Sequence, residues 1–202
     1  MIEIEMKFLL TDDQKEQLLA GAVNLGNLHI IDAYMDTDDF RLTTNDYWFR
    51  LRDGAYELKA PLVSGSGSYA ATNRYNEITD LEEIKRELKL DSVDDFDTAL
   101  SEAGIAPFMT CYTNRTSYEK DGFHIDIDTA TYLDSDFTYA VAEIELLVKD
   151  EADADVAEQK ILELAREYRL STDEVIPGKV AAYLEAESPE HYRVLVEAGV
   201  LK

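Results

Sequence analysis

The sequence has few basic residues, only one cysteine and no long apolar run. Of its 202 residues, 19 are Lys or Arg and 43 are Asp or Glu, which gives a formal net charge of −24. Nucleic acids and anionic membranes carry charge of the same sign, so we expect neither as a partner. No segment approaches the roughly 20 apolar residues that a transmembrane helix needs.

The scarcity of cysteine limits both covalent and metal chemistry. Cys111 is the only cysteine, so an intrachain disulfide and a zinc site built from several cysteines are excluded. The first residues also lack the basic segment and apolar run that are typical of a signal peptide. We therefore expect a cytoplasmic protein, and we expect it to be a monomer.

Alternating apolar and polar residues predict about eight strands, most of them joined as antiparallel hairpins. The clearest strand spans residues 2–8, and others are expected at 32–36, 47–52, 56–60, 69–78, 108–119, 123–131 and 139–149. Asp-Gly pairs at 53–54 and 121–122 predict hairpin turns. Helices are expected at 12–19, 79–90, 93–103, 152–168, 179–186 and 189–198, with capping boxes at Thr11 and Thr79 and a flexible Gly/Ser loop at 64–68. The pattern favours one α+β domain over residues 1–202.

Charged side chains gather on one face of several predicted strands. The residues that share such faces are Glu3, Glu5 and Lys7; Arg50 and Arg52, with Trp48; Glu57 and Lys59; Asp126 and Asp128; and Glu143 and Glu145. A charged face is ordinarily the solvated side of an antiparallel sheet. The helices, however, need the apolar strand faces as packing partners, and a closed sheet would then enclose the charges.

An enclosed charged lining suits a strongly charged ligand. Buried charges are tolerated when they are paired, hydrated or bound to metal. Carboxylates can hold Mg²⁺, and arginine and lysine can hold phosphate oxygens.

Seven short motifs follow one another in an order that resembles a known superfamily. Glu3-Ile4-Glu5-Met6-Lys7 matches the signature ExExK, which is weak alone. It is followed by D-x-Y-x-D-T at 32–37, W-x-R-x-R at 48–52, E-x-K at 57–59, Asn-Arg at 114–115, D-x-D at 126–128, E-x-E at 143–145 and then Lys179. Over nearly its whole length the chain thus resembles the CYTH superfamily, the triphosphate tunnel metalloenzymes. Trp48 and the segments 139–143 and 177–184 make it most similar to the thiamine triphosphatases.

The resemblance implies an eight-stranded antiparallel β-barrel that forms a tunnel and is wrapped by helices. It implies Mg²⁺-dependent hydrolysis of thiamine triphosphate to thiamine diphosphate and phosphate, with one or two Mg²⁺ ions bound. The implied metal ligands are Glu3, Glu5, Asp126, Glu143 and Glu145. The implied triphosphate ligands are Lys7, Arg50, Arg52, Lys59, Arg115 and Lys179. Asp128 is a weaker metal candidate, and Glu77 and His124 have no assigned role.

Two residues are given more specific roles. The resemblance suggests that Tyr34 and Lys59 form a catalytic pair, since a lysine among other cations is expected to have a lowered pKa and could help to remove a proton. The alternative is that Lys59 is only a phosphate ligand. Trp48 shares the face of the two arginines, so its indole is expected to bind thiamine through stacking and cation–π attraction. The alternative is a core tryptophan.

Several other functions remain open at this point. The same tunnel could serve an inorganic tripolyphosphatase or a nucleoside triphosphatase, and adenylate cyclase is a further activity of the superfamily. A non-catalytic polyphosphate-binding module and an acidic interaction protein with a solvated charged face are the alternatives from other classes.

Overall fold

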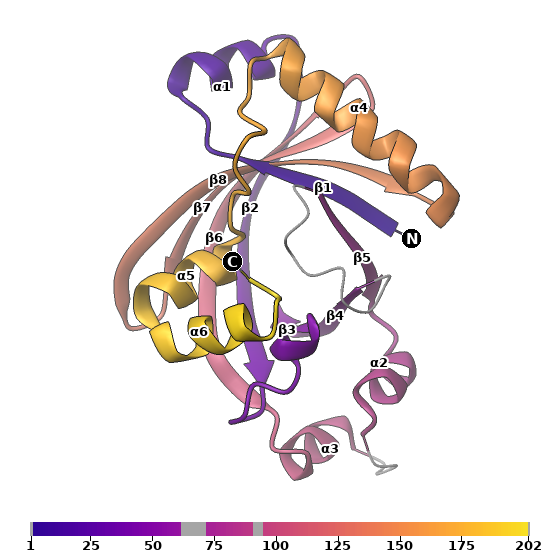
Figure 1. Ribbon diagram of the computed structural model, residues 1–202, viewed down its shortest axis with the longest axis vertical. Helices are drawn as coiled ribbons and strands as arrows, with labels where there is room; N and C mark the ends of the chain where they lie inside the picture. The colour runs from indigo at the N-terminus through magenta and orange to yellow at the C-terminus, as the bar shows by residue number, and fades with distance from the viewer. Residues whose placement is uncertain (1, 62–71, 91–94, 202) are drawn as a thin grey trace.

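The computed structural model describes residues 2–61, 72–90 and 95–201. At its centre is a closed antiparallel barrel with the strand order β1-β5-β4-β3-β2-β6-β7-β8 (Figure 1). The strands are β1 (Ile2–Phe8), β2 (Val23–Asp36), β3 (Trp48–Arg52), β4 (Ala55–Pro61), β5 (Thr72–Ile78), β6 (Ala106–Lys120), β7 (Phe123–Tyr132) and β8 (Ser135–Val148). The predicted α+β class and the eight-stranded barrel are confirmed.

Six α-helices accompany the barrel in the described part of the chain. They are α1 (Asp12–Leu19), α2 (Leu81–Leu88), α3 (Phe96–Glu102), α4 (Ala154–Glu167), α5 (Lys179–Glu187) and α6 (Pro189–Glu197), with short 3₁₀ turns η1 (Thr43–Asn45) and η2 (Glu151–Asp153). None of these helices is long and apolar enough to cross a membrane. The predicted Gly/Ser loop at 64–68, and the predicted starts of a strand at 69 and a helix at 93, lie outside the described residues.

Local chemistry explains most of the element boundaries. Asp53 and Gly54 both have positive φ, as do Asp121 and Gly122, and tight hairpins that match the strand twist require this conformation. The capping box at Thr11 is present, but the cap of α2 lies one residue after the predicted Thr79. This cap is Asp80, whose carboxylate accepts a hydrogen bond from the Glu83 amide at 2.9 Å. β2 begins at Val23, earlier than predicted. The sequence did not reveal this part of the strand because the segment before Ile30 is exposed and shows no alternation of apolar and polar residues.

Four helices cover the outside of the barrel on its apolar strand faces. α1 and α4 lie over β1 and β8, where Ile4 and Ile144 pack in one core with Ile161 of α4 (Figure 1). α2 and α3 pack in a second core with Phe49 and Leu58 of β3 and β4. The alternate, charged faces of these strands therefore point into the barrel, as the enclosed-lining interpretation requires.

The two C-terminal helices do not wrap the barrel but pack against its inner wall. Tyr34, Cys111 and Tyr132 alternate in phase with the inward-facing charged residues of their strands, and they form a core with α5 and α6. Figure 1 shows both helices within the curve of β6, β7 and β8. The Tyr132 hydroxyl donates a hydrogen bond to the Lys179 carbonyl at 2.8 Å, which brings the start of α5 to the charged lining.

A buried polar chain anchors α6 to the end of β2. Asp36 accepts hydrogen bonds from the Thr43 hydroxyl and the Thr43 amide, at 2.6 and 2.9 Å. His191 Nε2 lies 2.8 Å from the same hydroxyl, and because that hydroxyl donates its proton to Asp36, the imidazole must be the donor. Burial lowers the pKa of His191, which keeps the ring neutral.

Candidate active site

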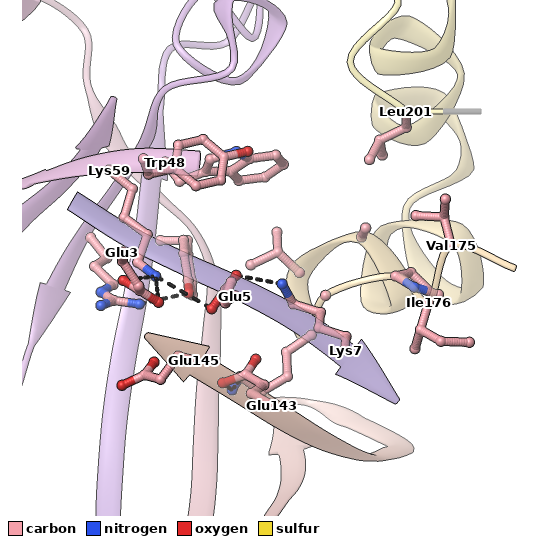
Figure 2. Close-up of a pocket in the computed structure, with 18 of the residues that line it drawn as sticks. Glu3, Glu5, Lys7, Trp48, Lys59, Glu143, Glu145, Val175, Ile176 and Leu201 are labelled. Carbon is pink, nitrogen blue, oxygen red and sulfur yellow. Dashed lines mark hydrogen bonds and ion pairs between the residues drawn. The ribbon is translucent and has the colours of Figure 1, made fainter. Parts of the chain in front are cut away.

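A cavity of about 720 Å³ lies in the barrel, between the charged strand faces and the C-terminal segment. Of the predicted site residues, all but Asp126 and the weaker metal candidate Asp128 line it. They are Glu3, Glu5, Lys7, Tyr34, Trp48, Arg50, Arg52, Lys59, Arg115, Glu143, Glu145 and Lys179. Figure 2 shows the acidic residues of β1 and β8 on one wall and Trp48 on another. The strands supply all of these side chains except Lys179 by simple alternation, since every second residue faces inward, and Lys179 comes from the start of α5.

Three carboxylates meet where the first strand pairs with the last. Oxygen atoms of Glu3, Glu5 and Glu145 all lie within 4.8 Å of one another. Burial raises the pKa of Glu3 to about 7, although Lys59 opposes this shift. Burial and the neighbouring carboxylates raise the pKa of Glu145 to about 8. Burial would also raise the pKa of Glu5, but Lys59 and Lys7 hold it well below its ordinary value.

This cluster has the chemistry of a site for a hard divalent cation. All three ligands offer oxygen, which Mg²⁺ prefers. Glu3 and Glu145 resist ionisation because they are buried and, in addition, because the neighbouring negative charges repel one another. A bound cation would remove that repulsion. It is the one group of three or more such ligands in the described part of the chain.

Asp126 and Glu143, the other predicted metal ligands, lie beside cations instead. Asp126 accepts hydrogen bonds from Ser117 at 2.6 Å and contacts His124 at 3.0 Å. Its second oxygen is in ion-pair contact with Arg115 but makes no hydrogen bond of good geometry. Glu143 lies 2.7 Å from Arg115 Nη2. Burial would raise the pKa of Glu143, but Lys179 and Arg115 lower it to about 2.

Lys59 does not have the environment that the sequence suggested. Its Nζ lies 3.0 and 2.9 Å from the two oxygens of Glu3 (Figure 2). Burial lowers the pKa of this ammonium, but Glu5 and Glu3 outweigh that effect and the pKa lies well above its ordinary value. The expectation of a lowered pKa was therefore wrong, because carboxylates from β1, and not cations, are the nearest charges.

The Tyr34 hydroxyl is hydrogen-bonded to an arginine and not to Lys59. Its hydroxyl accepts a hydrogen bond from Arg50 Nη1 at 3.2 Å, and no bond joins it to Lys59 among the described contacts. Arg50 also donates to Glu57 at 2.7 Å and to Glu77 at 3.3 Å. Glu77, which had no assigned role, thus lies on the cavity wall beside a phosphate-binding candidate.

Trp48 forms a half-buried wall of the cavity. Its indole N–H donates to Asp46 at 2.8 Å, and the Tyr75 hydroxyl donates to the same carboxylate oxygen at 2.9 Å. Val175, Ile176 and Leu201 lie across the cavity from the indole (Figure 2). Tyr75 was missed although it alternates in phase with Glu77. The three aliphatic residues follow no strand pattern, so nothing in the sequence placed them here.

Comparison with known proteins identifies the family. The sequence model of the CYTH domain matches residues 1–178. The chain belongs to the CYTH family. The thiamine-triphosphatase of Homo sapiens is 30% identical over 217 residues, which cover 98% of this chain and 91% of that protein. The thiamine-triphosphatase of Macaca fascicularis is also 30% identical, over 220 residues that cover 100% and 92%.

A solved structure of low sequence identity shares the fold. The PH1819 protein from Pyrococcus horikoshii OT3 aligns with a TM-score of 0.61 and 20% identity, covering 92% of this chain and 99% of that one. The predicted membership of the CYTH superfamily and the similarity to thiamine triphosphatases are confirmed. The family match ends at residue 178, one residue before α5, so Lys179 and Leu201 join the cavity from beyond it.

Proposed function

We propose that this CYTH protein is a Mg²⁺-dependent triphosphatase that hydrolyses thiamine triphosphate to thiamine diphosphate and phosphate. The observation that carries the proposal is the meeting, in one cavity, of six basic side chains, a three-carboxylate cluster and the only tryptophan of the chain. The 30% identity to two thiamine-triphosphatases supports the same substrate.

The basic and acidic side chains of the cavity have different roles in the proposed phosphoryl transfer. Such a reaction needs the terminal phosphoryl group held in line with a water molecule, and it needs the charge of the transferring group neutralised. Lys7, Arg50, Arg52, Lys59, Arg115 and Lys179 supply fixed positive charge for the triphosphate. Glu3, Glu5 and Glu145 would hold Mg²⁺, which supplies Lewis-acid stabilisation of phosphate oxygens. Asp126 and Glu143 remain candidates for a second ion.

Lys59 is assigned to phosphate binding in this proposal. Its raised pKa keeps the amine protonated, so it can donate hydrogen bonds but cannot accept a proton from water near neutral pH. The paired role with Tyr34 stays a prediction that depends on a different arrangement of the two side chains.

The outer part of the cavity suits a cationic head group. Trp48 offers an aromatic face, and apolar side chains lie across the cavity from it (Figure 2). The lining also contains the acids Asp173, Glu174 and Glu185. A thiazolium ring is both flat and positively charged, so it is attracted to an indole face and to carboxylates. Adenine lacks the positive charge and inorganic tripolyphosphate lacks any head group, so this polarity favours thiamine triphosphate.

The test is phosphate release from thiamine triphosphate, ATP and tripolyphosphate, measured in parallel with Mg²⁺ and with chelator. We expect a Mg²⁺-dependent preference for thiamine triphosphate. Trp48→Ala should weaken that preference while tripolyphosphate hydrolysis continues. Tyr112→Ala, which removes an exposed aromatic ring from the outer barrel wall, is the matched control and should change neither rate.

Other outcomes of these assays would favour a different function or a different role for Trp48. A wild-type preference for tripolyphosphate would favour an inorganic triphosphatase on the same tunnel. Equal losses of both activities in Trp48→Ala would remove the head-group role from the indole. Binding of tripolyphosphate without phosphate release from any substrate would favour a non-catalytic module.

A further inference from the structure

Three arginines of the cavity share one unusual arrangement. Each is paired with a carboxylate that lies directly opposite it on the neighbouring strand, namely Arg52 with Asp32, Arg50 with Glu57, and Arg115 with Asp128. In every pair the guanidinium donates through Nε and Nη2. The two distances are 2.7 and 3.0 Å for Arg52, 2.9 and 2.7 Å for Arg50, and 2.8 and 2.6 Å for Arg115.

These carboxylates are placed differently from the other acids of the site. All three arginines line the cavity, but Asp32, Glu57 and Asp128 do not. Asp32 and Asp128 are each 1% exposed. Asp128 also forms an ion pair with Lys179, so one buried carboxylate pairs with two cations, Arg115 of β6 and Lys179 of α5. The three acids therefore lie behind the basic residues and not beside the carboxylate cluster.

Simple electrostatics gives no reason for acids at these positions. A negative charge one side chain away from a phosphate-binding arginine repels the phosphate and weakens binding. Buried guanidinium groups, however, need partners before a ligand arrives. Asp32 and Asp128 accept through both carboxylate oxygens, and Glu57 accepts both Arg50 bonds on one oxygen. A contact through two N–H groups fixes the plane of the guanidinium as well as its charge. A guanidinium has five N–H donors, and this contact uses two of them. Arg52 keeps three further donors. Arg50 also donates to Tyr34 and Glu77, and Arg115 also contacts Asp126 and Glu143, so each of these two keeps one.

We propose that Asp32, Glu57 and Asp128 are positioning residues that hold the three guanidinium planes so that their remaining donors face the triphosphate. The inference rests on the proposed function, since it takes the cavity to be a triphosphate site. Arginine side chains that are already fixed lose little conformational freedom on binding, and this strengthens binding despite the repulsion. The same arrangement accounts for part of the acidic composition: a tunnel for a polyanion here contains a carboxylate behind each arginine.

The test measures binding of inorganic tripolyphosphate by calorimetry in chelator, where no turnover occurs. Asp32→Asn, Glu57→Gln and Asp128→Asn remove the negative charge with little change of shape. By analogy with the outer partners of metal ligands, we expect each to weaken binding by about 10- to 100-fold. Asp136→Asn, the same change on the exposed side of β8, should leave binding unchanged. The direction of the change in affinity is decisive, because removal of a negative charge alone would tighten the binding of an anion. Unchanged or tighter binding in the three variants would overturn the inference.

A double-mutant cycle separates positioning from a general effect on the fold. If Asp32 acts through Arg52, Asp32→Asn should have little further effect on binding in an Arg52→Ala background. A full, additive loss would overturn the positioning role for this pair. Thermal melting checks folding, and because the three substituted acids lie on the different strands β2, β4 and β7, a variant that fails to fold leaves two others to decide. Absence of tripolyphosphate binding by the wild type both in chelator and with Mg²⁺ would instead overturn the proposed function, and the inference with it.

Discussion

Replacing Glu145 by glutamine should stabilise the metal-free protein at alkaline pH. A carboxyl group whose pKa is higher in the folded state binds protons more tightly there, so its contribution to stability is full below its unfolded pKa and is lost as the pH rises. For Glu145 this window runs from the ordinary value of 4.5 to about 8. At about 1.4 kcal/mol per pKa unit, ionising this group costs on the order of 2–5 kcal/mol above pH 8, and Glu145→Gln avoids that cost.

The assay is urea unfolding of both proteins in chelator at several pH values from 4.5 to 9. The free energy of unfolding of the wild type should fall relative to the variant as the pH rises, and the two should agree best near pH 4.5. Added Mg²⁺ should stabilise the wild type more than the variant, because a ligand that binds only the folded state raises its stability. A variant that is less stable than the wild type at pH 8.5 in chelator would refute the reasoning that burial and the neighbouring carboxylates make ionised Glu145 unfavourable.

Three further predictions address Tyr34, Thr43 and Trp48. Tyr34→Phe should leave the shape of the pH–rate profile unchanged and lower turnover only modestly, because the Tyr34 hydroxyl bonds to Arg50 and not to Lys59. Loss of the alkaline limb of the profile in steady-state measurements would instead support a catalytic pair of Tyr34 and Lys59. Thr43→Val should lower the free energy of unfolding by about 1–3 kcal/mol, since it leaves buried Asp36 and His191 without their shared partner, whereas a melting curve like that of the wild type would contradict this. Thiamine diphosphate should quench the fluorescence of Trp48, the only tryptophan, more than pyrophosphate does at equal saturation, and equal quenching would place the head group elsewhere.

Strand alternation was sufficient to predict the inward faces of the barrel. Glu3, Arg50 and Glu143 each face the cavity because their strands have one apolar side that helices or cores must cover. The Asp-Gly turns fixed which strands pair as neighbours. These are local features, so they can be read from short segments of sequence without knowing the rest of the fold.

Contacts between distant strands could not be predicted in the same way. Lys59 lies against Glu3 because β5 sets the offset between β4 and β1, and that offset depends on the closure of the whole sheet. The sequence therefore predicted the face of Lys59 correctly and its pKa in the wrong direction. Likewise, Asp126 shares an inward face with other acids, but its partner is decided by the reach of Arg115. The position of α5 and α6 inside the barrel depends on tertiary packing that an amphipathic pattern does not reveal.

The carboxylate cluster has a consequence for the order in which the protein folds. Glu3 and Glu5 belong to the first strand of the barrel and Glu145 to the last, and the β1–β8 pairing that joins them also closes the sheet. Contacts between such distant segments carry a large loop-closure entropy and form late. The cluster therefore does not exist in an open sheet, and a chain still on the ribosome lacks it until β8 has emerged. Binding of a divalent cation would therefore require the closed barrel, and it would stabilise the β1–β8 pairing, which forms last.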